Sequence, residues 1–413
     1  MAKLLQKGKI VACLDMGSSK LVCIIASINN DEIKILGYAH KESKGISASA
    51  ISDMRLAQKA ITNVVSEAER MAGFNIDRLL VGISGSQVNS IRREVNNRIS
   101  SDIVKNSDII NLAEKIRHDF KKNNREILHL IPMQYSIDDS APVVNPRYMS
   151  GEKLHARFHT ISTSQTTIRN IENCFKRCQL SVNSYVVEPY ASALSCLTDN
   201  EMNFGTMLID IGGSSTSFCI ILEGKMIYLG SSPIGGNHVT KDISTILEVD
   251  MDTAEKIKSL NSSLLISPIE EREIIKFKFS DADFDEQNMI RITRLELRDI
   301  INSRLEELFE SVKTVLEKAG IPLYMLTNIV LTGGVASTVG IDKLAAEIFD
   351  KNVRIGYPNK FDLAPSEMLN PTHSCSLGML VFLRNLYLKE KIKDGFESKN
   401  SWFRRLIEKL AAV

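Results

Sequence analysis

The sequence lacks several features that would place the chain outside the cytoplasm or on nucleic acid. No apolar run reaches the roughly 18 residues that a membrane-spanning helix needs. The seven cysteines include no C-x-x-C pair, which favours buried, reduced thiols and a cytoplasmic protein. The amino terminus has no apolar stretch before a small-residue cleavage site, so we expect no signal peptide. A formal net charge of +1 gives no reason to expect a nucleic-acid binder, whose basic face usually moves the total.

What remains is the composition of an ordinary folded protein. The chain has 413 residues, of which 44% are hydrophobic and 24% are charged, and this excludes disorder, collagen and a small disulfide-stapled scaffold. At about 150 residues per domain, the length predicts two or three folding units, each large enough to bury a core.

The most informative pattern is an internal repeat. Residues Ile10 to Ile28 contain an apolar run, Asp15, a Gly/Ser turn and a second apolar run, and residues Thr206 to Leu222 repeat this order around Asp210. Apolar runs rich in β-branched residues and broken by Gly/Ser are typical of buried strands joined by a tight turn. Two such β-hairpins in one chain predict two related lobes.

The two turns have the composition of phosphate-binding loops. Backbone N–H groups bind phosphate, and only small side chains let the backbone come close enough. Asp15 and Asp210 each end a strand, where a carboxylate can hold Mg²⁺ through water. One Asp-x-Gly-Ser turn could equally be a plain hairpin, but two in repeated context and a third glycine pair favour a nucleotide site. The candidate residues are Asp15, Gly17, Ser18, Ser19 and Lys20, then Asp210, Gly212, Gly213, Ser214 and Ser215, then Gly333 and Gly334.

These turns resemble those of the actin-like ATPase superfamily, and the resemblance implies ATP held between two lobes, with adenosine near Gly333 and Gly334. It also implies that Glu188, in Glu188-Pro189-Tyr190-Ala191, orients the hydrolytic water or metal and, with Asp210, supports weak hydrolysis at most. Alternatively, Glu188 is only the acidic residue at a helix start.

Three further charged residues have two interpretations each. By the same resemblance Glu255 and Lys258 contact ribose or adenine, whereas as i, i+3 neighbours they could be a solvated ion pair. Lys20 either pairs with a phosphate or is a lysine at the edge of the turn.

Within this superfamily the chain is most similar to the FtsA family of bacterial division proteins. The similarity is carried by LHLIPMQYSID (Leu128 to Asp138), Asn145-Pro146, NIVLTGGVAS (Asn328 to Ser337), VRIGYP (Val353 to Pro358) and an amphipathic carboxyl end. It implies an α/β fold of two ribonuclease-H-like lobes with a small α+β subdomain inserted in the first lobe.

The resemblance also implies how the chain is divided. The expected units are the first lobe (1–86 and 160–200), the insert (87–159), the second lobe (201–235 and 305–388), its smaller subdomain (236–304), a linker (389–400) and a terminal helix (401–413). The insert is expected to make filament contacts with further copies of the chain and to meet later division proteins.

The smaller subdomain is expected to receive the carboxyl-terminal tail of FtsZ, the tubulin-like ring protein. Arg304 matches an arginine of that surface, although alone it could be a solvated pair with Glu307.

One departure from the family pattern concerns the second turn, which usually reads Asp-x-Gly-Gly-Gly-Thr and is often followed by a further Asp. This chain has Ser214 and Ser215 in the turn and Ser217 beyond it. Ser214 adds a Cβ where the backbone meets phosphate, and the missing acid weakens metal handling. We therefore expect binding of ATP and Mg²⁺ without fast hydrolysis.

The carboxyl end predicts an amphipathic helix on a membrane. At about 100° per residue its apolar side chains fall within an arc of about 140°, and basic residues that suit anionic lipid lie beside them. The predicted membrane residues are Trp402, Phe403, Arg404, Arg405, Leu406, Ile407, Lys409 and Leu410. A helix docked on its own domain or on a partner protein is the alternative. With the family resemblance, the expected place is the cytoplasmic face of the inner membrane at the division site.

Two other functions of the same fold stay open on the sequence alone. A small-molecule kinase would need a catalytic Asp and a sugar pocket in the first lobe, and nothing in the sequence marks them. A PilM-like adaptor of pilus machinery would be expected to lack both the terminal helix and the LHLIPMQYSID segment.

Overall fold

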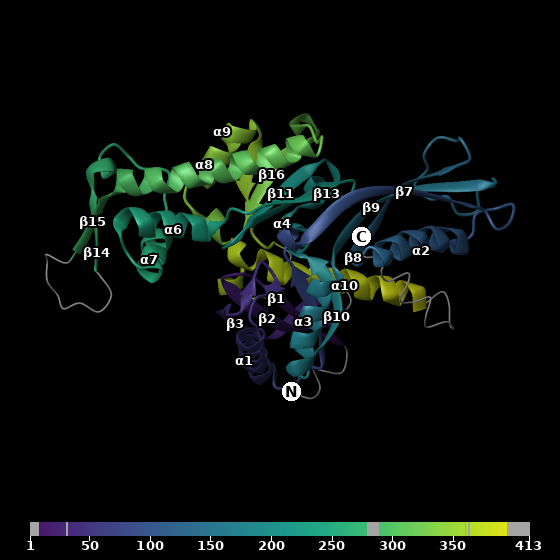
Figure 1. Cartoon of the computed structure of the whole chain (residues 1–413), viewed down its shortest axis with the longest axis horizontal. Helices are drawn as coiled ribbons and strands as arrows, with labels where there is room; N and C mark the ends of the chain where they lie inside the picture. Colours follow the sequence, from purple (N-terminus) through teal and green to yellow (C-terminus); the bar gives the residue numbers. More distant parts are fainter. Residues whose placement is uncertain (1–7, 30–31, 279–288, 360, 362–363, 395–413) are drawn as a thin grey trace.

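The structure is a computed structural model that describes residues 8–29, 32–278, 289–359, 361 and 364–394. Two α/β lobes lie against each other, and smaller units extend from opposite ends of the molecule (Figure 1). The predicted membrane residues, from Trp402 to Leu410, lie outside the described residues.

The sheet of the first lobe has the strand order β10-β6-β1-β2-β3. Its strands are β1 (Lys9–Met16), β2 (Lys20–Asn29), β3 (Glu32–Glu42), β6 (Arg78–Ile83) and β10 (Ser181–Val187). The pairs β1/β2 and β2/β3 are antiparallel, whereas β6 is parallel to both β1 and β10. Helices α1 (Met54–Ala72) and α3 (Gln165–Arg177) cover one face. A small hairpin of β4 (Ile46–Ser47) and β5 (Ala50–Ile51) stands beside this sheet.

The second lobe repeats this arrangement in the order β13-β12-β11-β16-β17. Its strands are β11 (Thr206–Ile211), β12 (Thr216–Leu222), β13 (Lys225–Ser232), β16 (Asn328–Thr332) and β17 (Asn352–Ile355). The hairpin is again antiparallel and the next strand parallel, and Asp210 pairs with Ser217 as Asp15 pairs with Val22. Helices α8 (Arg294–Lys318) and α9 (Ile341–Phe349) cover its outer face.

Two helices lie between the sheets and form a shared core with both. They are α4 (Glu188–Cys196) and α10 (Ser374–Asp394), and their apolar residues contact side chains of β1 and β2 as well as β11, β12 and β16. The short helix α5 (Asp199–Asn203) follows α4. Helix α10 continues to Asp394, so the first positions of the predicted linker 389–400 are helical, which corrects our expectation of a spacer that begins at Lys389.

The smaller subdomain of the second lobe lies at one end of the molecule, on the left in Figure 1. It contains α6 (Gly236–Leu247), α7 (Met251–Asn261), β14 (Ile274–Lys278) and β15 (Met289–Thr293). Asp250 accepts a hydrogen bond from the Thr253 N–H and is the N-cap of α7.

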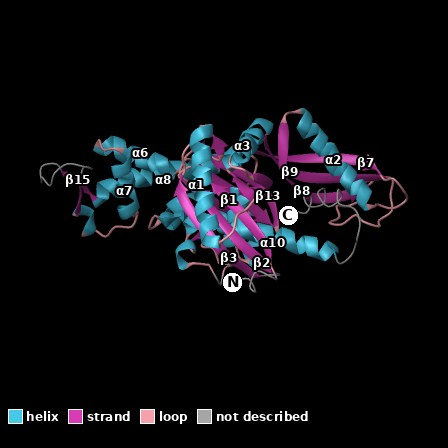
Figure 2. Cartoon of the chain, turned by 90° about the horizontal axis from the view of Figure 1, so that it is seen from below, coloured by secondary structure: helices cyan, strands magenta, loops and turns pink. Residues whose placement is uncertain are grey.

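The inserted subdomain lies at the opposite end, where a curved sheet carries one helix (Figures 1 and 2). The strand order is β7-β9-β8, and the elements are β7 (Val88–Arg98), α2 (Asn106–Lys122), β8 (Arg125–Ile137) and β9 (Lys153–Ser164). The base of this sheet contacts the second lobe, because His159 hydrogen-bonds through Nδ1 to the Met226 carbonyl oxygen and through Nε2 to Ser90 Oγ, both at 2.7 Å.

Short 3₁₀ turns complete the described chain. They are η2 (Gly85–Gln87), η3 (Glu270–Arg272), η5 (Leu323–Met325), η6 (Gly334–Ser337), η7 (Ser366–Met368) and η8 (Pro371–His373).

Candidate functional site

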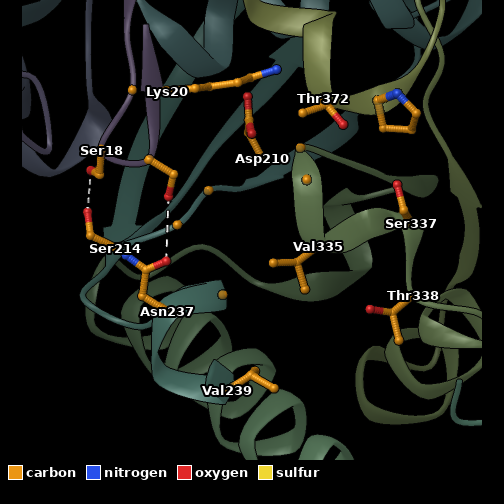
Figure 3. Close-up of a pocket in the computed structure, with 18 of the residues that line it drawn as sticks. Ser18, Lys20, Asp210, Ser214, Asn237, Val239, Val335, Ser337, Thr338 and Thr372 are labelled. Atoms are coloured by element: carbon orange, nitrogen blue, oxygen red, sulfur yellow. Dashed lines mark hydrogen bonds between the residues drawn. The ribbon is translucent and has the colours of Figure 1, made fainter. Parts of the chain in front are cut away.

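A cavity of about 770 Å³ lies between the two lobes, and both repeated turns line it (Figure 3). The structure brings together all of the predicted nucleotide-binding and catalytic residues on its wall. These are Asp15, Gly17, Ser18, Ser19, Lys20, Glu188, Asp210, Gly212, Gly213, Ser214, Ser215, Glu255, Lys258, Gly333 and Gly334.

The first turn joins β1 to β2 and places a carboxylate beside an ammonium group. Asp15 is 8% exposed near the end of β1, and Lys20 begins β2. Burial raises the pKa of Asp15, while the charge of Lys20 and a hydrogen bond from Cys375 oppose that rise. Burial lowers the pKa of Lys20, and the charge of Asp15 opposes that change. Lys20 therefore partly neutralises Asp15 within the first turn.

The second turn joins β11 to β12 and leaves its carboxylate less compensated. Burial raises the pKa of Asp210 to about 6, and the nearby Asp15 adds to the rise. Ser192 donates a hydrogen bond of 2.5 Å to Asp210 Oδ2, which favours the ionised form but does not offset burial. The carboxyl group of Asp210 is held at the cavity wall, where a bound cation would favour its ionisation.

The glycines of the second and third turns allow close backbone approach. A Cβ on Gly213 would lie 2.1 Å from Ser19 Oγ, so a side chain at this position would displace the Ser19 hydroxyl. Gly333, at the start of the third turn, has a φ of +88°, and a Cβ there would lie 2.5 Å from Asp210 Oδ1. At both positions a side chain would overlap atoms of the cavity wall.

Glu188 begins α4, and its half-buried side chain lines the cavity. Burial raises the pKa of Glu188 well above its usual range, and the charge of Asp15 raises it further. Glu188 Oε1 lies 2.7 Å from Ser49 Oγ, which also lies 3.2 Å from the Met16 carbonyl oxygen and accepts from the Ser84 N–H. A hydroxyl has one proton and two lone pairs, so all three contacts are satisfied when a protonated Glu188 donates and Ser49 donates to Met16.

Ser49 is a residue that the sequence did not reveal. Together with Ala48 it forms the tip of the β4–β5 hairpin, and their φ angles of +61° and +46° are unusual for residues other than glycine. A glycine at this tip would have marked the turn in the sequence, whereas Ser-Ala-Ser gives no such signal. Ser49 is 0% exposed and is separated from Glu188 by 139 positions, so only the fold brings them together.

The acidic residues of the cavity fit a cation held at least partly by water. In the part of the chain that the structure describes, no three His, Cys, Asp or Glu side chains are close enough together to hold a metal ion directly. The charge of Asp15 nevertheless raises the pKa of Asp210, and a divalent ion between the two carboxylates would offset their repulsion. The residues therefore fit Mg²⁺ bound through its hydration shell.

The other end of the cavity contains polar residues of α7 and η6. Lys258 Nζ donates to Glu255 Oε2 at 2.6 Å, to Thr240 Oγ1 at 2.8 Å and to the Gly236 carbonyl oxygen at 3.1 Å. These contacts use all three protons of the ammonium group. Glu255 and Lys258 form the ion pair that their spacing allowed, and both residues line the cavity. The half-exposed Glu255 is the member of the pair that a sugar hydroxyl can reach.

Sequence reasoning missed several polar residues at this end. Ser262 and Thr338 share a hydroxyl hydrogen bond of 2.9 Å, and Ser337 and Asn237 also line the cavity. These residues lie within α6 and η6 or directly after α7 and η6, and nothing else in the sequence marks them.

Arg304 does not line the cavity. Its guanidinium makes two hydrogen bonds with Asp242 of α6, from Nε at 2.6 Å and from Nη2 at 2.8 Å, and a third from Nη1 to Glu307. The pair with Glu307 was anticipated, whereas the pair with Asp242 links α8 to α6 and could not be inferred from sequence spacing.

None of the helices in the described residues has the length and the apolar composition that crossing a membrane requires.

Comparison with known proteins identifies the family. The sequence model described as "Cell division protein FtsA" matches residues 207–378, and the one described as "SHS2 domain inserted in FTSA" matches residues 85–162. FtsA of Agrobacterium fabrum is 30% identical over 91% of this chain and 87% of its own length. FtsA of Borreliella burgdorferi is 31% identical over 95% of this chain and 98% of its own length.

Solved structures with the same architecture are more distant in sequence. A PilM-PilN type IV pilus biogenesis complex contains a chain that is 15% identical, with a TM-score of 0.64, over 91% of this chain and 98% of that one. MreB5 of Spiroplasma citri bound to ADP is 16% identical, with a TM-score of 0.56, over 93% of this chain and 98% of that one. At such identities the likeness concerns the fold alone.

These findings confirm two predictions made from the sequence. The fold is the predicted two-lobed, actin-like α/β fold with an inserted subdomain in the first lobe. The resemblance to division proteins is confirmed by full-length relatives at about 30% identity and by the two matching sequence models. The chain belongs to the FtsA family of cell division proteins.

Proposed function

We propose that this FtsA-family protein binds ATP with Mg²⁺ in the cavity between its lobes and uses it mainly as a conformational ligand. The observation that carries the proposal is the convergence of the Asp15 and Asp210 turns on one cavity. The two MreB5 structures, one bound to ADP and one to AMPPNP, support the same ligand class. When bound, the ion supplies charge neutralisation for the phosphates, and the two turns supply backbone and hydroxyl donors.

We further propose that hydrolysis is slow. A general base must be ionised near the working pH, whereas burial and the charge of Asp15 favour the neutral form of Glu188. Ser217 stands where the family pattern often has Asp, and its side chain lies against η2. A Cβ on Gly85 would be 2.6 Å from Ser217 Oγ, so a longer acidic side chain at position 217 would crowd η2.

Membership of the FtsA family supports a further proposal about assembly. We propose that the chain polymerises at the cytoplasmic face of the inner membrane at the division site and that residues 401–413 attach it to anionic lipid. One short amphipathic helix binds weakly, but many copies in one filament bind tightly, because each further attachment is effectively intramolecular.

The partners are assigned by the same proposal. The insert contacts further copies and later division proteins, and the subdomain of α6 and α7 receives the FtsZ tail. Arg304 contributes by fixing α6 against α8, since its hydrogen bonds to Asp242 are directed across that contact. This role refines the predicted direct contact between Arg304 and the partner.

Calorimetry of Mg-ATP binding tests the site. Asp210→Ala removes a cavity carboxylate, and we expect Mg-ATP affinity to fall by about 100-fold, the scale of removing two charge-assisted interactions. The exposed Asp139 of the insert gives a matched control, since Asp139→Ala changes the same charge far from the cavity. Wild-type affinity in Asp210→Ala would remove the assignment, and rapid phosphorylation of a small molecule would favour a kinase instead.

Co-sedimentation with anionic liposomes tests the attachment. Trp402→Glu places a charge among the predicted apolar residues and should release the protein, while Trp402→Phe should retain binding. Equal sedimentation of all three proteins would contradict the proposed anchor.

A further inference from the structure

The β1–β2 turn, which contains Ser18, and the β11–β12 turn, which contains Ser214, touch each other directly across the cavity. Ser18 of the first turn and Ser214 of the second turn place their hydroxyl oxygens 2.5 Å apart, although 196 positions separate them in the sequence. Figure 3 shows this contact beside the hydrogen bond that reaches Asn237. The lobes are therefore joined at the cavity by side chains of the turns themselves.

A second contact next to this one packs a side chain of the first turn against the backbone of the second. Ser19 Oγ occupies the space that a Cβ on Gly213 would need, at 2.1 Å, and it donates to Asn237 Oδ1 at 3.5 Å. The absence of a side chain on Gly213 lets the first turn insert into the second. The contact between Ser18 and Ser214 is thus part of a fitted surface between the lobes.

The hydroxyl of Ser18 is also held from its own lobe. The Ala48 N–H donates to Ser18 Oγ at 2.9 Å, from the tip of the β4–β5 hairpin. A hydroxyl has one proton and two lone pairs, so this bond still leaves Ser18 one donor and one acceptor for Ser214. The hairpin therefore fixes Ser18 in the position from which it reaches the opposite lobe.

An oxygen–oxygen distance of 2.5 Å leaves no room for a phosphate oxygen between the two hydroxyls. A phosphate that takes hydrogen bonds from both turns must first separate them. We propose that Ser18 and Ser214 form a cross-lobe latch that closes the turns on each other in the nucleotide-free protein and that the triphosphate of ATP opens it. This inference rests on the proposed function, because it assumes that ATP phosphates bind at these turns.

The latch makes the two serines depend on each other in a way that binding can measure. Each serine has two effects on ATP affinity: it holds the latch that ATP must open, and it can donate to phosphate once the latch is open. Either alanine substitution alone removes the whole latch, so the second substitution cannot remove it again. Loss of the latch raises ATP affinity by about five-fold, the worth of one hydrogen bond. The product of the two single effects counts this gain twice, whereas the double variant contains it once.

The test is a double-mutant cycle in ATP affinity on the full-length protein. Mg-ATP binding is measured by calorimetry for wild type, Ser18→Ala, Ser214→Ala and the double variant. We expect the double variant to bind about five-fold more weakly than the product of the two single effects predicts. Adenosine, which has no phosphate to separate the turns, should show no such coupling.

A matched control pair lies within the second lobe. Ser232 and Ser311 share a hydroxyl hydrogen bond of 2.8 Å away from the cavity wall, so their cycle should be additive for ATP. Wild-type ATP binding with an additive Ser18/Ser214 cycle overturns the latch alone. Failure of the wild-type protein to bind ATP overturns the proposed function and the latch with it.

Discussion

The two repeated turns have similar sequences and the same strand pairing, but the charged groups near their carboxylates, Asp15 and Asp210, differ. In the first turn, Lys20 lies at the start of β2 and partly neutralises Asp15. In the second turn, Ser215 stands at the matching position, and the pKa of Asp210 rises to about 6. The second turn instead has Gly213, which allows the opposite turn to approach.

This difference shows that two copies of a repeated turn can contribute different groups to one site. In the proposed nucleotide site, phosphate binding needs positive charge and close backbone donors, and neither turn supplies both in full. The first turn contributes the ammonium group, and the second contributes backbone without side chains. Substitutions that exchange or remove these properties should therefore have unequal effects in the two turns.

The largest difference is expected from glycine substitutions. Gly235 lies behind the second turn, and a Cβ there would be 2.7 Å from the Gly212 and Gly213 carbonyl oxygens and from the Ser215 nitrogen. Because backbone surrounds it, Gly235→Ala should destabilise the protein by about 3 kcal/mol and reduce ATP affinity by more than about 100-fold. Chemical unfolding and calorimetry measure both effects.

The comparison in the first turn is Gly17→Ala, whose Cβ would be 2.8 Å from a single backbone atom, the Lys20 carbonyl oxygen. It should cost less than half as much stability. Equal losses from the two substitutions would show that the turns tolerate added volume alike, which would contradict the proposed difference between them.

The next effect concerns pH. Asp210 has a folded pKa of about 6 against an unfolded value near 3.9, so the folded protein holds this proton more tightly. Its stabilising contribution is present below about pH 4 and is lost as pH rises through about 6, by at most about 3 kcal/mol. Asp210→Asn removes this loss, so the nucleotide-free variant should be more stable than wild type at pH 7.5 and equal to it near pH 4.

Urea unfolding between pH 4 and pH 8 measures this dependence. Asp15→Asn is the comparison, and its effect should be smaller because Lys20 opposes the rise in the pKa of Asp15. A larger pH effect for Asp15→Asn than for Asp210→Asn would reverse the assigned roles of the two turns.

The smallest effect is expected from Lys20→Gln, which makes the first turn resemble the second. Without the ammonium group the pKa of Asp15 should rise further, and ATP affinity should fall by about tenfold, the scale of one charge-assisted contact. Binding measured at low and high salt should become less salt-dependent than in wild type. An unchanged affinity would assign Lys20 to the edge of the turn, the alternative that the sequence left open.

The sequence predicted the elements whose signals are local. Buried β-branched runs on both sides of a Gly/Ser turn indicated the hairpins at Asp15 and Asp210, and the structure pairs those strands as expected. The same signals located one cavity, because strand ends that are repeated in two lobes face each other when the lobes pack.

Contacts between distant segments could not be predicted in this way. The hydrogen bond of Ser49 to Glu188 depends on a hairpin with positive φ angles and no glycine. Spacing offered Glu307 as an alternative partner for Arg304, but the fold also brings Asp242, 62 positions away, within reach. Helix α10 extends past Lys389 because lysine and glutamate favour helix, a propensity that the charge of the segment obscured.

Helix α10 connects distant points of the molecule. Cys375, in its first turn, lines the cavity, and its last residue, Asp394, is the described position nearest in sequence to the predicted membrane helix. Its 21 residues span about 31 Å at the usual helical rise. Used as a lever, a rod of that length converts a tilt of about 10° at the cleft into a displacement of about 5 Å at its far end. A tilt of α10 at the cleft would therefore move its far end more than its near end.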